Sequence, residues 1–128
     1  MKNKKNNFRL VLTTAALVGA ALIATSTQST IPARMLFPLY IAPGTNGNNW
    51  NAVISANTYG NIDVILNPSN GPGSVKQTNY VNGIARLKAA NVGIYGYVHS
   101  TYGDRSIVDV KADVDKWVNW YAPITGIF

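Results

Sequence analysis

After residue 34, short apolar runs alternate with longer segments in which apolar residues recur at helical spacing. The apolar runs predict strands at 35–43, 62–67, 93–99 and 124–128. The segments between them predict helices at 50–60, 79–92 and 106–122. This alternation is typical of an α/β fold in which helices cover a parallel sheet. The order β-α-β-α-β-α-β fits an open doubly wound sheet or part of an eight-unit barrel. No GxGxxG or GxxxxGK(S/T) motif follows the first strand, which disfavours the nucleotide-binding versions.

Residues at the helix ends and on the helix faces give finer expectations. Asn48 or Asn49 is placed to cap the first helix, and Ser106 with Asp109 resembles a capping box at the third. The third helix carries an apolar stripe that we expect to face the core, made of Ile107, Val110, Val114, Trp117, Val118 and Tyr121. The charged residues of this helix fall on its other face, so we expect them to be solvated.

The first 30 residues have the composition of a secretory signal peptide followed by a short leader. Residues 1–9 carry four basic residues and no acid, residues 10–24 are apolar or small, and small or polar residues follow. The apolar run is shorter than the roughly 20 residues of a membrane span. A leader cut between residues 24 and 30 is therefore favoured over an uncleaved anchor. We expect a secreted, extracellular or cell-surface protein with no membrane span after cleavage.

Charge and composition exclude several function classes. The chain has a formal net charge of +6, but its leader contributes four of the basic residues. The remainder has seven basic residues against five aspartates, a balance of +2, which gives no reason to expect a nucleic-acid partner. The sequence has no cysteine, no glutamate and a single histidine, so we expect neither a metal site nor a cofactor.

Polar and aromatic residues gather where the predicted strands end, which is where α/β folds place their chemistry. Aromatic faces and amide or imidazole hydrogen bonds suit a neutral sugar, and the candidate binding residues are Tyr40, Asn67, Asn70, His99 and Tyr102. Each also has a structural interpretation. Tyr40 could fill the mouth of a barrel, Asn67 could bond its own turn, and the lone His99 could be structural. Asp104 and Arg105 suggest a local ion pair or helix-start charges, and Asp63 opens its strand at the opposite edge.

Five motifs stand in this order along the chain: "PLYIAP", "NPSNGPG", "ANVGIYGYVHSTYGDR", "DVKADVDKWVNWY" and "GIF". In order and spacing they resemble those of the spherulation-specific family 4 (spherulin-4-like) proteins. The resemblance covers about residues 35–128. It implies a secreted (β/α)8 TIM-like barrel, of which this chain would form the N-terminal half. It also implies a relationship to glycoside hydrolases that cut α-1,4-linked galactosamine or N-acetylgalactosamine polysaccharide. Tyr40, Asn67, His99 and Tyr102 then become expected groove residues.

In that family the strand beginning "GIF" typically continues into Asp-Glu, so the resemblance places the expected catalytic acids beyond Phe128. We therefore assign no catalytic residue in this chain and expect a truncated barrel domain at 35–128 that is inactive by itself. Two alternatives stay open: a non-catalytic secreted or cell-surface module that binds amino-sugar polysaccharide, and an α/β binding protein unrelated to hydrolases. The first and fourth strands would be open edges, through which we expect self-association.

Overall fold

The computed structural model describes residues 32–128, so the predicted secretory leader lies outside the described residues. Strands and helices alternate throughout, in the order β1 (Arg34–Leu39), α1 (Asn51–Ala56), β2 (Asn61–Leu66), α2 (Thr78–Ala89), β3 (Gly93–Gly96), α3 (Ile107–Tyr121) and β4 (Gly126–Ile127). Two short 3-10 helices, η1 (Thr45–Trp50) and η2 (Thr101–Gly103), follow β1 and β3. Each strand and α-helix overlaps its predicted segment, although β1, β2 and α2 begin one residue earlier than predicted. Within residues 32–128, no helix combines the length and apolarity needed to cross a membrane.

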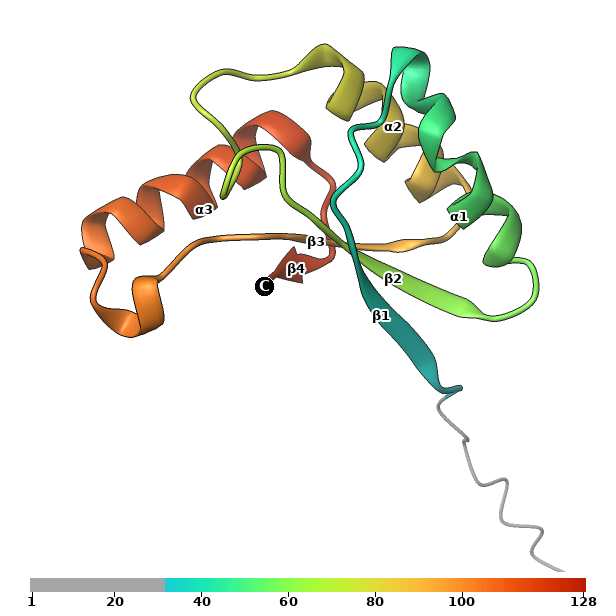
Figure 1. Cartoon of the computed structure of the whole chain (residues 1–128), viewed down its shortest axis with the longest axis horizontal. Helices are drawn as coiled ribbons and strands as arrows, with labels where there is room; N and C mark the ends of the chain where they lie inside the picture. The colour runs from blue at the N-terminus through green and yellow to red at the C-terminus, as the bar shows by residue number, and fades with distance from the viewer. Residues whose placement is uncertain (1–31) are drawn as a thin grey trace, which may run out of the picture. The chain divides into compact units, whose positions relative to one another are not determined.

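The four strands form one parallel sheet whose spatial order, β1-β2-β3-β4, is the order of the sequence. The helices α1, α2 and α3 all lie on one side of this sheet (Figure 1). A doubly wound sheet reverses its strand order and carries helices on both faces. Sequential order with helices on one face is the arrangement of a (β/α)8 barrel. The described residues thus form the N-terminal half of a TIM-like barrel, which resolves the choice that the sequence pattern left open.

The core fills the space between the sheet and the three helices. It is built on fully buried aromatic and aliphatic side chains, among them Trp50, Val64, Leu66, Leu87 and Trp117. The Trp50 ring meets Tyr80 edge-on with centroids 5.6 Å apart, and its Nε1 donates to the Ile41 carbonyl at 2.8 Å. Trp50 can lie this close to α2 because α2 has Gly83 there: a Cβ at that position would come within 2.6 Å of the indole.

The predicted helix caps are wrong. Trp50 occupies the N-cap position of α1 without a side-chain cap bond, because Asn49 donates to the Ala42 carbonyl and Asn48 accepts from Arg86 instead. Ser106 does precede α3, but its side chain makes no cap hydrogen bond. Both asparagines and Arg86 tie the η1 segment to its neighbours, so tertiary contacts replace the local caps.

The predicted apolar stripe of α3 is wrong in part. The buried side chains of this helix are Asp113, Trp117 and Tyr121, spaced four residues apart, while Ile107 and Val118 are exposed. The buried face is therefore rotated toward Asp113, which we had expected in solvent.

Candidate functional site

The carboxyl ends of the strands carry a group of side chains that we call the strand-end surface: Tyr40, Asn67, Tyr97, His99, Tyr102 and Phe128. Tyr40 directly follows β1, Asn67 follows β2, Tyr97 follows β3 and Phe128 follows β4. Parallel pairing brings these ends to one edge of the sheet, and the Tyr97 amide still bonds the Leu66 carbonyl at 2.9 Å. Tyr40 and Phe128 each expose more than half of their surface. The sheet thus presents aromatic rings to solvent at the edge expected for chemistry.

Tyr40, Tyr97 and His99 are brought together in one cluster. The Tyr40 and Tyr97 rings meet edge-on with their centroids 6.4 Å apart. The Tyr97 hydroxyl lies 3.5 Å from His99 Nδ1, and the Thr101 hydroxyl lies 3.0 Å from His99 Nε2. Both imidazole nitrogens thus lie near hydroxyl groups, and His99 lines a hollow of about 330 Å³ together with Tyr97, Tyr102 and Phe128.

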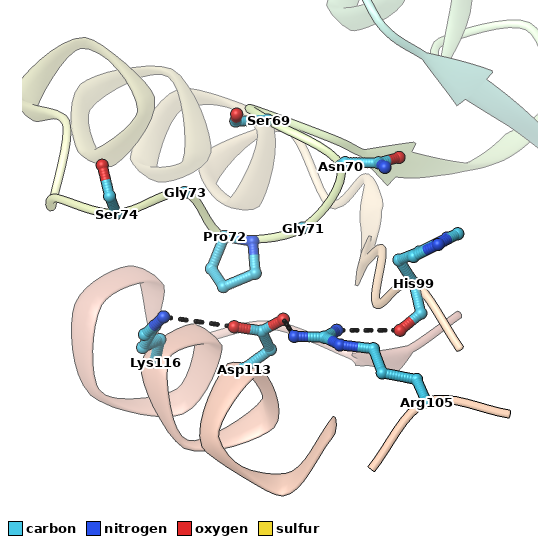
Figure 2. Close-up of a pocket in the computed structure, with 10 residues that line it drawn as sticks. All are labelled: Ser69, Asn70, Gly71, Pro72, Gly73, Ser74, His99, Arg105, Asp113 and Lys116. Atoms are coloured by element: carbon cyan, nitrogen blue, oxygen red, sulfur yellow. Dashed lines mark hydrogen bonds and ion pairs between the residues drawn. The ribbon is translucent and has the colours of Figure 1, made fainter. Parts of the chain in front are cut away.

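The loop after β2 builds a second hollow beside the first. Asn67 Oδ1 accepts a hydrogen bond from the Gly71 amide at 2.9 Å, so this asparagine does bond its own turn. Asn70 and Gly71 adopt positive φ angles of 52° and 147°, which turn the loop toward α3. The resulting hollow of about 470 Å³ lies between residues 69–74 and α3, with His99 at its rim (Figure 2). Asn70 and His99 therefore line one hollow, although they follow different strands.

Asp113 lies at the floor of this second hollow rather than in solvent. Its carboxylate pairs with Arg105 Nη2 at 2.7 Å and with Lys116 Nζ at 3.2 Å (Figure 2). Burial by itself raises the pKa of Asp113, but the hydrogen bonds and charges of Arg105 and Lys116 outweigh burial and hold that pKa below its ordinary value of 3.8. The suggested Asp104–Arg105 pair is wrong, because Arg105 turns to Asp113 instead.

Tyr102 is presented by a strained turn. Thr101, Tyr102 and Gly103 have successive φ angles of 50°, 54° and 100°, and the Tyr102 side chain is fully exposed. A left-handed conformation costs a non-glycine residue about 1–3 kcal/mol, and such strain clusters at functional sites. An aromatic ring held in solvent by a strained backbone is a candidate for ligand contact, as expected for Tyr102.

Asp63 lies at the other end of the sheet, away from the strand-end surface. Its carboxylate accepts from Arg34 Nε at 2.8 and 2.9 Å, and Gly93 provides the space for this pair. The Asp63 side chain is nearly buried, and the ion pair raises the pKa of Arg34 mainly through the side-chain hydrogen bond. Asp63 therefore has a structural partner, and within residues 32–128 no group of three potential ligands gathers to hold a metal.

Tyr97, Thr101 and Phe128 belong to the site but were not among the residues predicted from the sequence. Tyr97 carried a signal, because it alternates with Tyr95 and His99 on one face of the predicted strand. Thr101 carried none, since its contact with His99 depends on a left-handed turn that no local motif required.

Comparison with known proteins is consistent with this geometry. Residues 34–128 match the family described as spherulation-specific family 4. The chain belongs to this family. Spherulin-4 of Physarum polycephalum is 38% identical over 121 residues, which cover 93% of this chain and 35% of the relative. The crystal structure of Aspergillus clavatus Sph3 in complex with GalNAc is similar at a TM-score of 0.60 and 32% identity, over 70% of this chain and 37% of Sph3. This member of spherulation-specific family 4 thus spans little more than a third of the relatives it matches.

Proposed function

We propose that the strand-end surface binds an amino-sugar polysaccharide of the α-1,4-linked galactosamine or N-acetylgalactosamine type, within a protein related to glycoside hydrolases. The observation that carries the proposal is the Tyr40–Tyr97–His99 cluster at the carboxyl edge of a barrel-type sheet. The GalNAc complex of the Sph3 structure, at 32% identity, supports a sugar of this class.

The chemistry of the surface suits the neutral, N-acetylated form of this sugar. The exposed rings of Tyr40 and Phe128 offer apolar faces to the C–H side of a pyranose, and the Tyr40 hydroxyl stays available to solvent or ligand. His99 and Asn70 can exchange hydrogen bonds with sugar hydroxyls or an acetamido group. Tyr102 extends the surface outward, where a neighbouring sugar unit of a polymer would lie.

Cleavage of a glycosidic bond needs two carboxylates that flank it, one of which protonates the leaving oxygen. The sequence has no glutamate and five aspartates, of which Asp63 and Asp113 are held in ion pairs. Within residues 32–128, no aspartate side chain lines the first hollow, the one beside Tyr97 and His99. We propose that hydrolysis requires the acids expected after Phe128, and that residues 1–128 alone bind the polymer without cutting it.

We also propose that the protein is exported, which places it beside such polymers. The support is the basic and apolar pattern of residues 1–24. Recovery of the protein from the culture medium of an expressing cell, with its N-terminus between residues 25 and 31, tests this part of the proposal.

Calorimetric titration with α-1,4-linked N-acetylgalactosamine oligosaccharides tests the binding proposal. Tyr40→Ala and His99→Ala should each weaken binding about tenfold, equivalent to about 1.4 kcal/mol. Tyr59→Ala is the control, because Tyr59 is a tyrosine just beyond the end of α1 that is even more exposed than Tyr40, and it should bind normally.

Equal affinity in all three variants would remove Tyr40 and His99 from the site. A folded protein that binds no glycan would favour an α/β binding protein unrelated to hydrolases. A reducing-end assay on the same mixtures separates the remaining alternatives: new ends identify a hydrolase, and binding without new ends identifies a non-catalytic module.

A further inference from the structure

The carboxylate of Asp113 is linked to the main chain of His99 through one guanidinium. Arg105 Nη2 contacts Asp113 Oδ2 at 2.7 Å, and Arg105 Nη1 donates to the His99 carbonyl at 2.8 Å (Figure 2). Lys116 fixes the other carboxylate oxygen from the next turn of α3. Asp113 is only 8% exposed, so this is a buried anchor rather than a loose surface pair.

The same carboxylate lies close to the loop after β2. A Cβ built on Gly71 would lie 3.4 Å from Asp113 Oδ2, an ordinary contact distance, and Gly71 directly follows Asn70. Asp113 therefore lies between the two loops that carry Asn70 and His99.

The segment that Arg105 holds needs such an anchor. Between His99 and Arg105 the chain passes through the left-handed residues Thr101 and Tyr102, a conformation that persists only where surrounding contacts fix it. The Arg105 amide bonds the Ser100 carbonyl at 3.1 Å and closes the turn, while its side chain ties the turn to α3. Loss of the tie would let the turn relax and would move the His99 ring with it.

We propose that Asp113 is a positioning residue, which through Arg105 holds His99 and the Tyr102 turn in the geometry of the strand-end surface. The importance of that geometry for sugar binding rests on the proposed function. The position of His99 itself does not, so the two can be tested separately.

NMR spectroscopy of the unliganded protein provides the first test, because His99 is the sole histidine of the sequence and its imidazole signals need no assignment by mutation. Asp113→Asn should shift the His99 Nδ1, Nε2 and Hε1 resonances while the Trp50 indole signal stays in place. Asp115→Asn is the matched control, since Asp115 is exposed on the same helix, and it should leave all of these signals unchanged. His99 signals that stay unchanged in a folded Asp113→Asn protein would overturn the proposal.

Arg105→Lys is the second variant and carries the test should Asp113→Asn fail to fold. Lysine keeps the charge but lacks the planar fork that spans Asp113 and the His99 carbonyl. We expect it to shift the His99 signals as well; wild-type signals in this variant would show that charge alone suffices and would overturn the proposal.

Titration of the same variants with an α-linked N-acetylgalactosamine oligosaccharide adds a functional arm. Asp113→Asn should lose at least fivefold in affinity and Asp115→Asn none. Wild-type protein that binds no sugar would refute the proposed function alone, because the NMR result stands without a ligand.

Discussion

Gly96 packs against the indole of Trp117, a buried side chain that supports the site. A Cβ at Gly96 would come within 2.4 Å of Trp117 Cδ2 and 2.7 Å of two further ring atoms. Trp117 has no room to retreat: its Nε1 donates to the Tyr97 carbonyl at 2.8 Å, and its ring packs on Tyr121 with centroids 5.1 Å apart. The change Gly96→Ala therefore overpacks the core at the base of the strand-end surface.

The expected cost follows from two opposing effects. Overpacking a dense core typically costs about 1–3 kcal/mol. Replacing a glycine restricts the unfolded chain, which returns about 0.4–1 kcal/mol where the backbone is compatible, and Gly96 has no positive φ angle. The free energy of unfolding should fall by about 1–2 kcal/mol. For a domain of this size each kcal/mol corresponds to about 4–8 °C in Tm.

Urea denaturation followed by tryptophan fluorescence measures this loss. Gly60→Ala is the control, because a Cβ at Gly60 meets nothing within 4 Å and the residue has no positive φ. It should raise the free energy of unfolding slightly, by the restriction of the unfolded chain alone. A Gly96→Ala protein as stable as wild type, with unchanged fluorescence, would refute the packing of Trp117 against β3.

Three further predictions concern charge and association. Folding lowers the pKa of Asp113, so its ionised carboxylate stabilises the folded state above the unfolded pKa near 3.8, and this stabilisation is lost as the pH falls below that value. The difference in free energy of unfolding between wild type and Asp113→Asn should therefore shrink in acid, and a difference independent of pH would contradict this. Burial raises the pKa of Tyr80 and Tyr121 above 10.0, so their contribution to the free energy of unfolding should be complete below pH 10 and be lost at higher pH. Ultraviolet titration should show two tyrosines that ionise at a higher pH than the others, and simultaneous ionisation of all seven would contradict this. The outer edge of β1 has no strand partner within residues 32–128, and it borders an apolar hollow lined by Met35, Phe37 and Tyr59 among others. Sedimentation velocity should therefore show self-association at micromolar concentration, and a monomer that unfolds cooperatively would contradict this.

The strands and helices could be predicted from the sequence because each is specified by a short, local pattern. The segment 62–67 is a continuous apolar run, and β2 is buried along almost its whole length. The choice between a doubly wound sheet and a barrel could not be made from the residue pattern, because strand order is a property of the sheet. The resemblance supplied a barrel, and the sequential strand order together with one-sided helices confirms it.

Several residues of the candidate site could be predicted from the sequence, but the contacts between them could not. Tyr40 and His99 were named from their place at strand ends, yet the ring of Tyr97 that lies between them was not. Asp113 was misplaced because a helix pattern counts an acid as polar, whereas the side chains of Arg105 and Lys116 come from a loop and the next turn to neutralise it. A buried charge is recognised only once its partners are known.

The buried face of α3 both packs into the core and holds the loops that carry the candidate site. Asp113, Trp117 and Tyr121 recur every four residues, so they form one row along the helix. Each contributes a polar contact to a strand exit: Asp113 through Arg105 to the His99 carbonyl, Trp117 to the Tyr97 carbonyl, and the Tyr121 hydroxyl to the Pro72 carbonyl at 3.3 Å. A purely apolar row would bury the same face without fixing these carbonyls. The row therefore sets the geometry of two loops at once, and a shift of α3 along its axis would move the sides of both hollows together.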